Sequence, residues 1–147
     1  MKHREKYLEL IDKMASNPKV SRMNQYIQHG NVTTLDHVKA VSRMSFWLND
    51  HLHANARTDV LLYGSMLHDY YLYDWHYHDG RLHGFSHPKA AMALAAADFQ
   101  LPDGTEHVIR AHMWPLTLFH MPLSREAWLV TAADKLVALN ETIRKRG

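Results

Sequence analysis

The chain has 147 residues, close to the length of a single domain, and is 46% hydrophobic and 22% charged, which excludes a second full-sized fold and a disordered polymer. It contains no cysteine, so disulfides, thiolate zinc sites, iron–sulfur clusters and cysteine nucleophiles are excluded. The net charge of +2 is small and no segment is apolar enough for a signal peptide or membrane span, so we expect a cytoplasmic protein that binds neither nucleic acid nor membrane.

The first third of the chain is dominated by apolar residues at helical spacing. They recur over residues 5–16 and predict a first helix, which Pro18 ends. A short second helix is expected over residues 19–28. Thr33 or Thr34 can cap a long third helix, because a threonine hydroxyl at this position accepts a hydrogen bond from an unpaired backbone N–H. Strand alternation is almost absent from the sequence.

The rest of the chain predicts four more helices. A fourth helix begins near residue 58, and residues 70–85 mix aromatic, histidine and glycine residues in a segment that we expect to form a lid or pocket wall. Ser86 can cap a fifth helix that runs to residue 99, a sixth helix covers about residues 105–113, and Ser124 begins a seventh. We therefore expect an all-α fold, a single compact domain of six or seven helices.

Polar side chains of the kind that bind metals fall on helix faces that should be buried. His37 lies on the apolar face of the third helix, Asp134 lies between Val130 and Val137, and His112 follows an apolar turn. A bare carboxylate in such a place is costly unless a positive charge or a metal ion compensates it. The sequence therefore predicts a cationic partner for Asp134.

Histidine is unusually abundant, with 13 copies against 15 acidic residues. It is the commonest nitrogen ligand for metals and a frequent general acid or base. The neighbours His68 and Asp69 would point about 100° apart on a regular helix, but at a helix end they can flank one point from two sides. The pair therefore suits two ligands of one cation, or of two neighbouring cations.

These residues resemble the signature of the HD superfamily of metal-dependent phosphohydrolases, in which a histidine, an adjacent His–Asp pair and a distant aspartate lie in a helical chain. The signature falls on His37, on His68 with Asp69, and on Asp134, in the segments LDHVKAV, SMLHDYY and VTAADKL. The resemblance implies that these four side chains hold a divalent metal ion.

The resemblance also implies one HD-type helical domain over residues 1–147, with its core at about 29–141. By similarity to the two-metal branches of the family, His87 and His112 would bind a second ion, with Asp69 bridging the two. Two divalent cations about 3.5–4 Å apart can share a carboxylate and a hydroxide that attacks phosphorus. Nitrogen and oxygen ligands favour iron or manganese and also accept zinc, nickel, cobalt or magnesium, and the sequence does not choose between one ion and two.

The implied activity is hydrolysis of a phosphate mono- or diester, with a nucleotide as the expected small-molecule partner, by a metal-bridged hydroxide. The candidate catalytic residues are Asp69, His68 and Lys135. Cations near a metal pair improve the binding of phosphate oxygens, and aromatic rings stack on bases. The candidate substrate contacts are Arg125 for a phosphate oxygen, Trp114 for a base, and His83 from the expected loop.

The sequence departs from several branches of this family. The Gly–Lys pair that often follows His–Asp is replaced in HDYYLYDW, and the pieces typical of cyclic di-GMP phosphodiesterases are missing, so no particular substrate is implied. The main alternative is a regulatory HD module that binds a nucleotide signal without turnover. A histidine-rich metal store and a dinuclear-iron oxygenase are further alternatives, and the sequence specifies neither the oligomeric state nor a role for His76 and His78.

Overall fold

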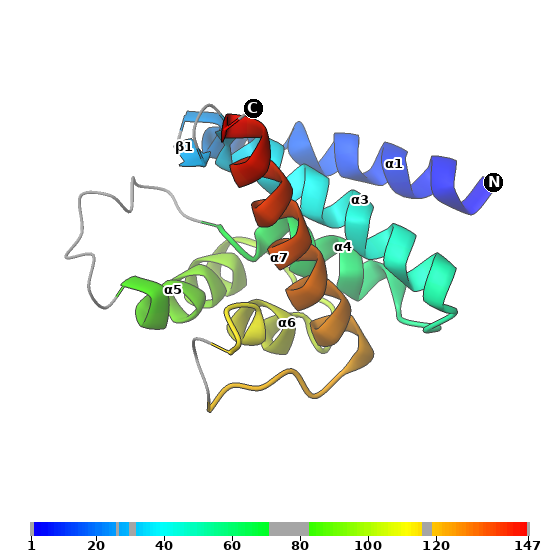
Figure 1. The fold of residues 1–147 in the computed structure, drawn as a ribbon. Helices are drawn as coiled ribbons and strands as arrows, with labels where there is room; N and C mark the ends of the chain where they lie inside the picture. Colours follow the sequence, from blue (N-terminus) through cyan, green and yellow to red (C-terminus); the bar gives the residue numbers. More distant parts are fainter. Residues whose placement is uncertain (1, 26, 30–31, 71–82, 116–118, 147) are drawn as a thin grey trace.

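The computed structural model describes residues 2–25, 27–29, 32–70, 83–115 and 119–146, which contain seven α-helices, one 3-10 helix and one short β-ribbon (Figure 1). The expected all-α fold is confirmed. In chain order the elements are α1 (Lys2–Ala15), α2 (Pro18–Ser21), the 3-10 helix η1 (Arg22–Gln25), β1 (Ile27–His29), β2 (Val32–Thr33), α3 (Thr34–Leu52), α4 (Thr58–Leu67), α5 (His83–Asp98), α6 (Thr105–Ala111) and α7 (Arg125–Arg146). Within these ranges no helix combines the length and the apolar character needed to cross a bilayer.

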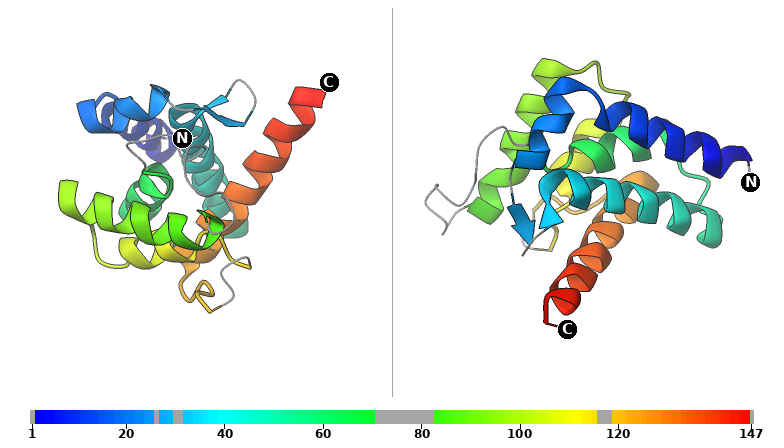
Figure 2. Two further views of the ribbon diagram at one scale, coloured as in Figure 1. Left: turned by 90° about the vertical axis from the view of Figure 1, so that its left-hand side faces the viewer. Right: turned by 90° about the horizontal axis from the view of Figure 1, so that it is seen from above.

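Helix α4 lies in the middle of the molecule. It contacts α1, α3, α5, α6 and α7, and Figures 1 and 2 show it surrounded by them. Because it is covered on all sides, its residues are apolar around most of the helix, in contrast to the striped helices at the surface. Residues of α4 enter both core clusters, one with residues of α1, α3, α5 and α6 and the other with residues of α3, α6 and α7. The carboxyl end of α4 is therefore enclosed by protein.

Capping signals fix the ends of the two helices that pack most closely on one another, α3 and α7. Thr33 caps α3 as expected, its Oγ1 accepting a hydrogen bond from the Asp36 backbone N–H at 3.1 Å. At the start of α7, Ser124 Oγ accepts from the Ala127 N–H at 3.1 Å. Both caps fix the residue at which a helix that carries candidate site residues begins.

The expected second helix over residues 19–28 is wrong. Only four residues form α2, followed by η1, and Ile27–His29 then pairs antiparallel with β2, Ile27 opposite Thr33. Among the described residues between α1 and the ribbon, only Val20 and Met23 are buried, so this part of the chain lacks the continuous apolar stripe that holds a longer helix against a core. The ribbon leads the chain directly into the cap of α3.

Two other boundaries differ from expectation. Helix α5 begins at His83, so Ser86 lies inside the helix and does not cap it. Helix α6 ends at Ala111, with His112 as its C-cap residue. Of the expected lid over residues 70–85, the stretch 71–82 lies outside the described residues, and with it His76 and His78.

Candidate metal centre

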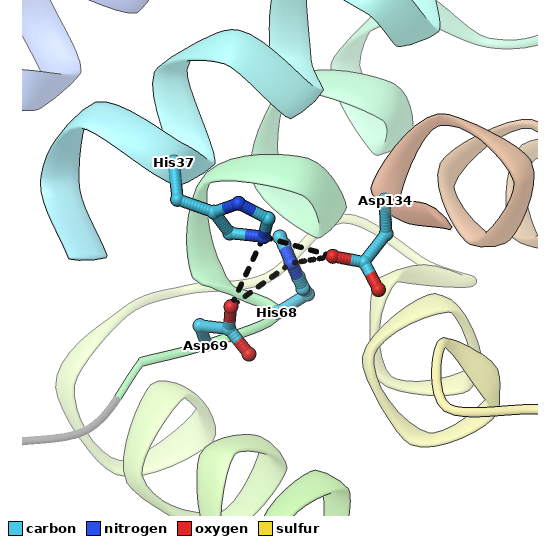
Figure 3. Close-up of side chains that lie close together, drawn as sticks. All are labelled: His37, His68, Asp69 and Asp134. Carbon is cyan, nitrogen blue, oxygen red and sulfur yellow. Dashed lines mark hydrogen bonds and ion pairs between the residues drawn. The ribbon is translucent and has the colours of Figure 1, made fainter. Parts of the chain in front are cut away.

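Three helices bring four ligand-type side chains to one point at the carboxyl end of α4 (Figure 3). His37 lies in the first turn of α3, His68 is the C-cap residue of α4 with Asp69 directly after it, and Asp134 comes from the middle of α7. Because α4 ends just before His68, the side chains of His68 and Asp69 converge, which neighbours on a regular helix cannot do. The expectation that these two neighbours can flank one point at a helix end is confirmed.

The nitrogens and oxygens of this cluster face one another across short distances. His37 Nε2 lies 2.8 Å from Asp134 Oδ1 and 3.5 Å from Asp69 Oδ2. His68 Nε2 lies 3.2 Å from each of the same two oxygens. The two imidazoles and the two carboxylates therefore surround a common centre, although His37 and Asp134 are 97 residues apart in sequence.

The outer nitrogen of each histidine is held by a hydrogen-bond acceptor. The Nδ1 atoms of His68 and His112 donate to the carbonyl oxygen three residues earlier, at 2.5 and 2.6 Å, and His37 Nδ1 lies 3.1 Å from both carboxylate oxygens of Glu141. A carbonyl oxygen can only accept, so Nδ1 of His68 and His112 carries the proton. Nε2 is thus the atom that each ring presents to the centre. In metal sites generally, an acceptor bonded to the outer ring nitrogen orients a histidine ligand in the same way.

The cluster is buried and strongly negative before protons or metal ions are added. His37 and His68 are fully buried and Asp69 is 3% exposed. Burial alone lowers the pKa of both imidazoles, but hydrogen bonds and the charges of Asp69 and Asp134 outweigh it, raising the pKa of His37 to about 9 and that of His68 well above its ordinary value. Burial raises the pKa of Asp134, yet its hydrogen bonds with the two imidazoles shift it far below the ordinary range. Two carboxylates in this setting attract positive charge, either two protons or one divalent ion.

The donor atoms fit a single divalent ion. One ligand atom from each of His37, His68, Asp69 and Asp134 can be chosen so that all lie within 4.8 Å of one another. Ligands bound at about 2.0–2.6 Å can be at most about 4–5 Å apart across the ion. The four side chains can therefore hold a metal ion, and two neutral imidazoles with two carboxylates would balance its charge of +2.

One of the two additional expected ligands lies beside this cluster. His112 is fully buried, and its Nε2 is 3.6 Å from Asp69 Oδ1, the carboxylate oxygen that is turned away from His37 and His68. Burial lowers the pKa of His112, which keeps its imidazole neutral. His87 lies on α5, but its side chain falls outside the described residues, so its expected role as a ligand stays a prediction.

Lys135 lies at the edge of the cluster. Its Nζ donates to the His112 carbonyl oxygen at 2.9 Å and is 4.0 Å from Asp134 Oδ2. Its side chain is 44% exposed, so the ammonium group borders both the buried centre and solvent. Partial burial lowers the pKa of Lys135, opposed by the charges of Asp134 and Asp69.

The three expected substrate contacts have different surroundings. Arg125 begins α7, about two and a half turns before Asp134, and its Nη1 donates to the Asn55 carbonyl oxygen at 3.5 Å, away from the cluster. Trp114 follows α6 and packs edge-on against Trp128 with ring centres 5.2 Å apart. The side chain of His83, the first residue of α5, lies outside the described residues.

Glu141 joins the cluster although the sequence did not predict it. Its side chain is 8% exposed and pairs with His37 from α7. Glu141 follows Asp134 by seven residues, two helical turns, so both carboxylates face α3 from the same side of α7. That spacing was the available signal, but it selects Glu141 only once α3 and α7 are known to pack together.

Comparisons with known protein families, with curated proteins and with solved structures found no match for this chain. The class of protein is therefore defined by the fold and the cluster alone. It is an all-α protein with a buried His/Asp group that can hold a metal ion, an arrangement compatible with an HD domain.

Proposed function

We propose that this chain is an HD-type metal-dependent phosphohydrolase that cleaves a phosphate mono- or diester, with a nucleotide as substrate. The observation that carries the proposal is the convergence of His37, His68, Asp69 and Asp134 around one buried centre. These are the four positions of the HD signature, and they come from three helices that the signature alone does not place together. Iron and manganese suit this set of nitrogen and oxygen donors.

Four side chains of the centre are suited to hold the metal ion, and His112 lies where it can help to hold a second one. His37, His68, Asp69 and Asp134 would hold the ion, which when bound supplies a Lewis acid that activates water near neutral pH and polarises a phosphate oxygen. Asp69 faces His37 and His68 with Oδ2 and His112 with Oδ1. A carboxylate with one oxygen on each side is suited to bridge two ions, which supports His112 as a ligand of a second one.

Lys135 supplies a positive charge where a phosphate group would enter. Its ammonium is anchored by the His112 carbonyl oxygen and remains partly exposed beside Asp134. A fixed ammonium at the edge of a buried site stabilises negative charge that develops on phosphate oxygens. We expect Lys135→Ala to reduce turnover while leaving the metal content unchanged.

The test is hydrolysis by purified protein that has been depleted of metal and then loaded with manganese or ferrous iron. Release of p-nitrophenol from bis(p-nitrophenyl) phosphate and of phosphate from a nucleotide panel should depend on the added metal. Asp69→Ala should lose both tight metal binding and turnover. Asp103→Asn, at an exposed turn before α6, is the matched control and should behave as the wild type.

The alternatives give different results in the same experiment. Tight binding of one or two ions and of a nucleotide, without release of product, would indicate a regulatory module and not an enzyme. Uptake of many weakly held ions would indicate metal storage. Turnover that consumes oxygen would indicate an oxygenase, and unchanged metal content and rate in Asp69→Ala would refute the metal centre itself.

A further inference from the structure

We infer that Glu141 is a positioning residue of the metal centre: its carboxylate holds the His37 ring so that Nε2 points at the ion site, and it thereby sets the affinity of the site. The inference rests on the proposed metal centre and concerns a residue that contacts one of its ligands and not the ion. Both oxygens of Glu141 lie 3.1 Å from His37 Nδ1. On the opposite edge of the ring, Nε2 lies 2.8 Å from Asp134.

The need for Glu141 follows from where each histidine lies on its helix. The last carbonyl groups of a helix have no intrahelical N–H partner. His68 and His112 are the C-cap residues of α4 and α6, so the carbonyl oxygens of Ser65 and Ile109 can accept from their Nδ1 atoms. Each of these rings is thus oriented by its own helix end.

His37 cannot be oriented in this way, because it lies in the first turn of α3. The carbonyl groups of a first turn point along the helix and bond to N–H groups four residues later. The ring is fully buried, so its Nδ1–H needs an acceptor from another part of the fold. Glu141 provides that acceptor from α7, 104 residues away in sequence.

Helix α7 therefore clamps the His37 ring between two of its own carboxylates. Asp134 faces the inner nitrogen, and Glu141, two turns later, faces the outer one. A carboxylate acceptor on Nδ1 fixes the tautomer and increases the basicity of Nε2, and loss of such a partner lowers metal affinity about 10–100-fold in metal sites generally. Because Glu141 also lines a groove of about 900 Å³ between α1, α3 and α7, its substitution need not empty the core.

The test compares zinc affinity in the full chain as wild type, Glu141→Ala, Glu141→Gln and the control Asn140→Ala. Glutamine keeps an acceptor oxygen, whereas alanine removes it. We expect Glu141→Ala to weaken zinc binding about 10–100-fold, Glu141→Gln to restore most of the loss, and Asn140→Ala, which shortens a side chain of the same turn, to have no effect.

Ring ¹⁵N spectra of the zinc-loaded proteins separate orientation from general loss of structure. The His37 signals, assigned by their absence in His37→Gln, should show protonated Nδ1 and metal-bound Nε2 in the wild type and Glu141→Gln, but not in Glu141→Ala. Unchanged affinity and unchanged His37 signals in Glu141→Ala, with zinc bound normally, would overturn this inference alone. A wild-type chain that binds no zinc, manganese or iron would overturn the metal centre and this inference with it.

Discussion

Asp134→Asn is the substitution that tests the cluster most directly, because it removes one negative charge and keeps the shape of the side chain. Asp134 Oδ1 is the atom that faces both imidazoles, at 2.8 Å from His37 Nε2 and 3.2 Å from His68 Nε2. In the metal-free protein, the loss of this negative charge breaks the ion pairs of Asp134 with two buried imidazoles, at a cost of about 3 kcal/mol. Each variant is therefore compared with its own metal-free form.

The expected effect appears in the stabilisation that metal binding provides. Metal at about 100 times its dissociation constant stabilises the wild type by about 2.7 kcal/mol, which raises the melting temperature of a domain of this size by about 5–10 °C. If loss of one of four ligands weakens binding about 100-fold, the same metal concentration stabilises Asp134→Asn by only about 0.4 kcal/mol, or about 1–2 °C.

The assay is thermal unfolding followed by circular dichroism, with and without manganese or zinc. Asp103→Asn makes the same chemical change at an exposed turn and should keep the full wild-type shift. A metal-induced shift in Asp134→Asn equal to that of the wild type would refute the claim that Asp134 is a ligand, whatever the variant's metal-free stability.

Three further predictions concern the metal-free protein and the core around α4. The pKa of His37, about 9 against an ordinary 6.5, means that its proton stabilises the fold fully below about pH 6.5 and that this contribution is lost as the pH rises through about 9; urea titrations should show the decline, and a flat profile would contradict it. Gly64→Ala would place a Cβ 2.6 Å from Val108 Cγ1, so we expect a loss of about 1–3 kcal/mol in chemical unfolding that Val108→Ala partly relieves. Tyr7→Phe removes the 2.8 Å hydrogen bond to the buried Ser42 hydroxyl and should cost about 1–3 kcal/mol, with part of the loss recovered by adding Ser42→Ala.

Local signals in the sequence were sufficient for most of the helices. Thr33 and Ser124 have side chains that can bond an N–H two or three residues later, so the starts of α3 and α7 are encoded within a few residues. The ribbon was not predicted because a three-residue strand such as the one that pairs Ile27 with Thr33 has no recognisable sequence pattern. Its short strands give no alternation long enough to distinguish them from a helical turn.

The chemistry of the four ligands was also encoded locally, since histidine or aspartate on an apolar helix face requires a compensating partner wherever the chain folds. Which atoms meet is a different matter. The pairing of His37 with Asp134 and Glu141 spans 97 and 104 residues, and it depends on the rotation and crossing of α3 and α7, which no short segment specifies. For the same reason Arg125 was grouped with the site, although it lies at the start of α7, about two and a half turns before Asp134, and donates to the Asn55 carbonyl oxygen.

The amino-acid sequence thus determined the helices and the kinds of side chain that need a cation, because caps, periodicity and burial act through neighbours along the chain. Only the packing of α3 and α7 against the end of α4 decided that the four ligand side chains meet at one centre and that Glu141 supports His37. Those outcomes are contacts between distant helices, and their geometry exists only once the core has formed.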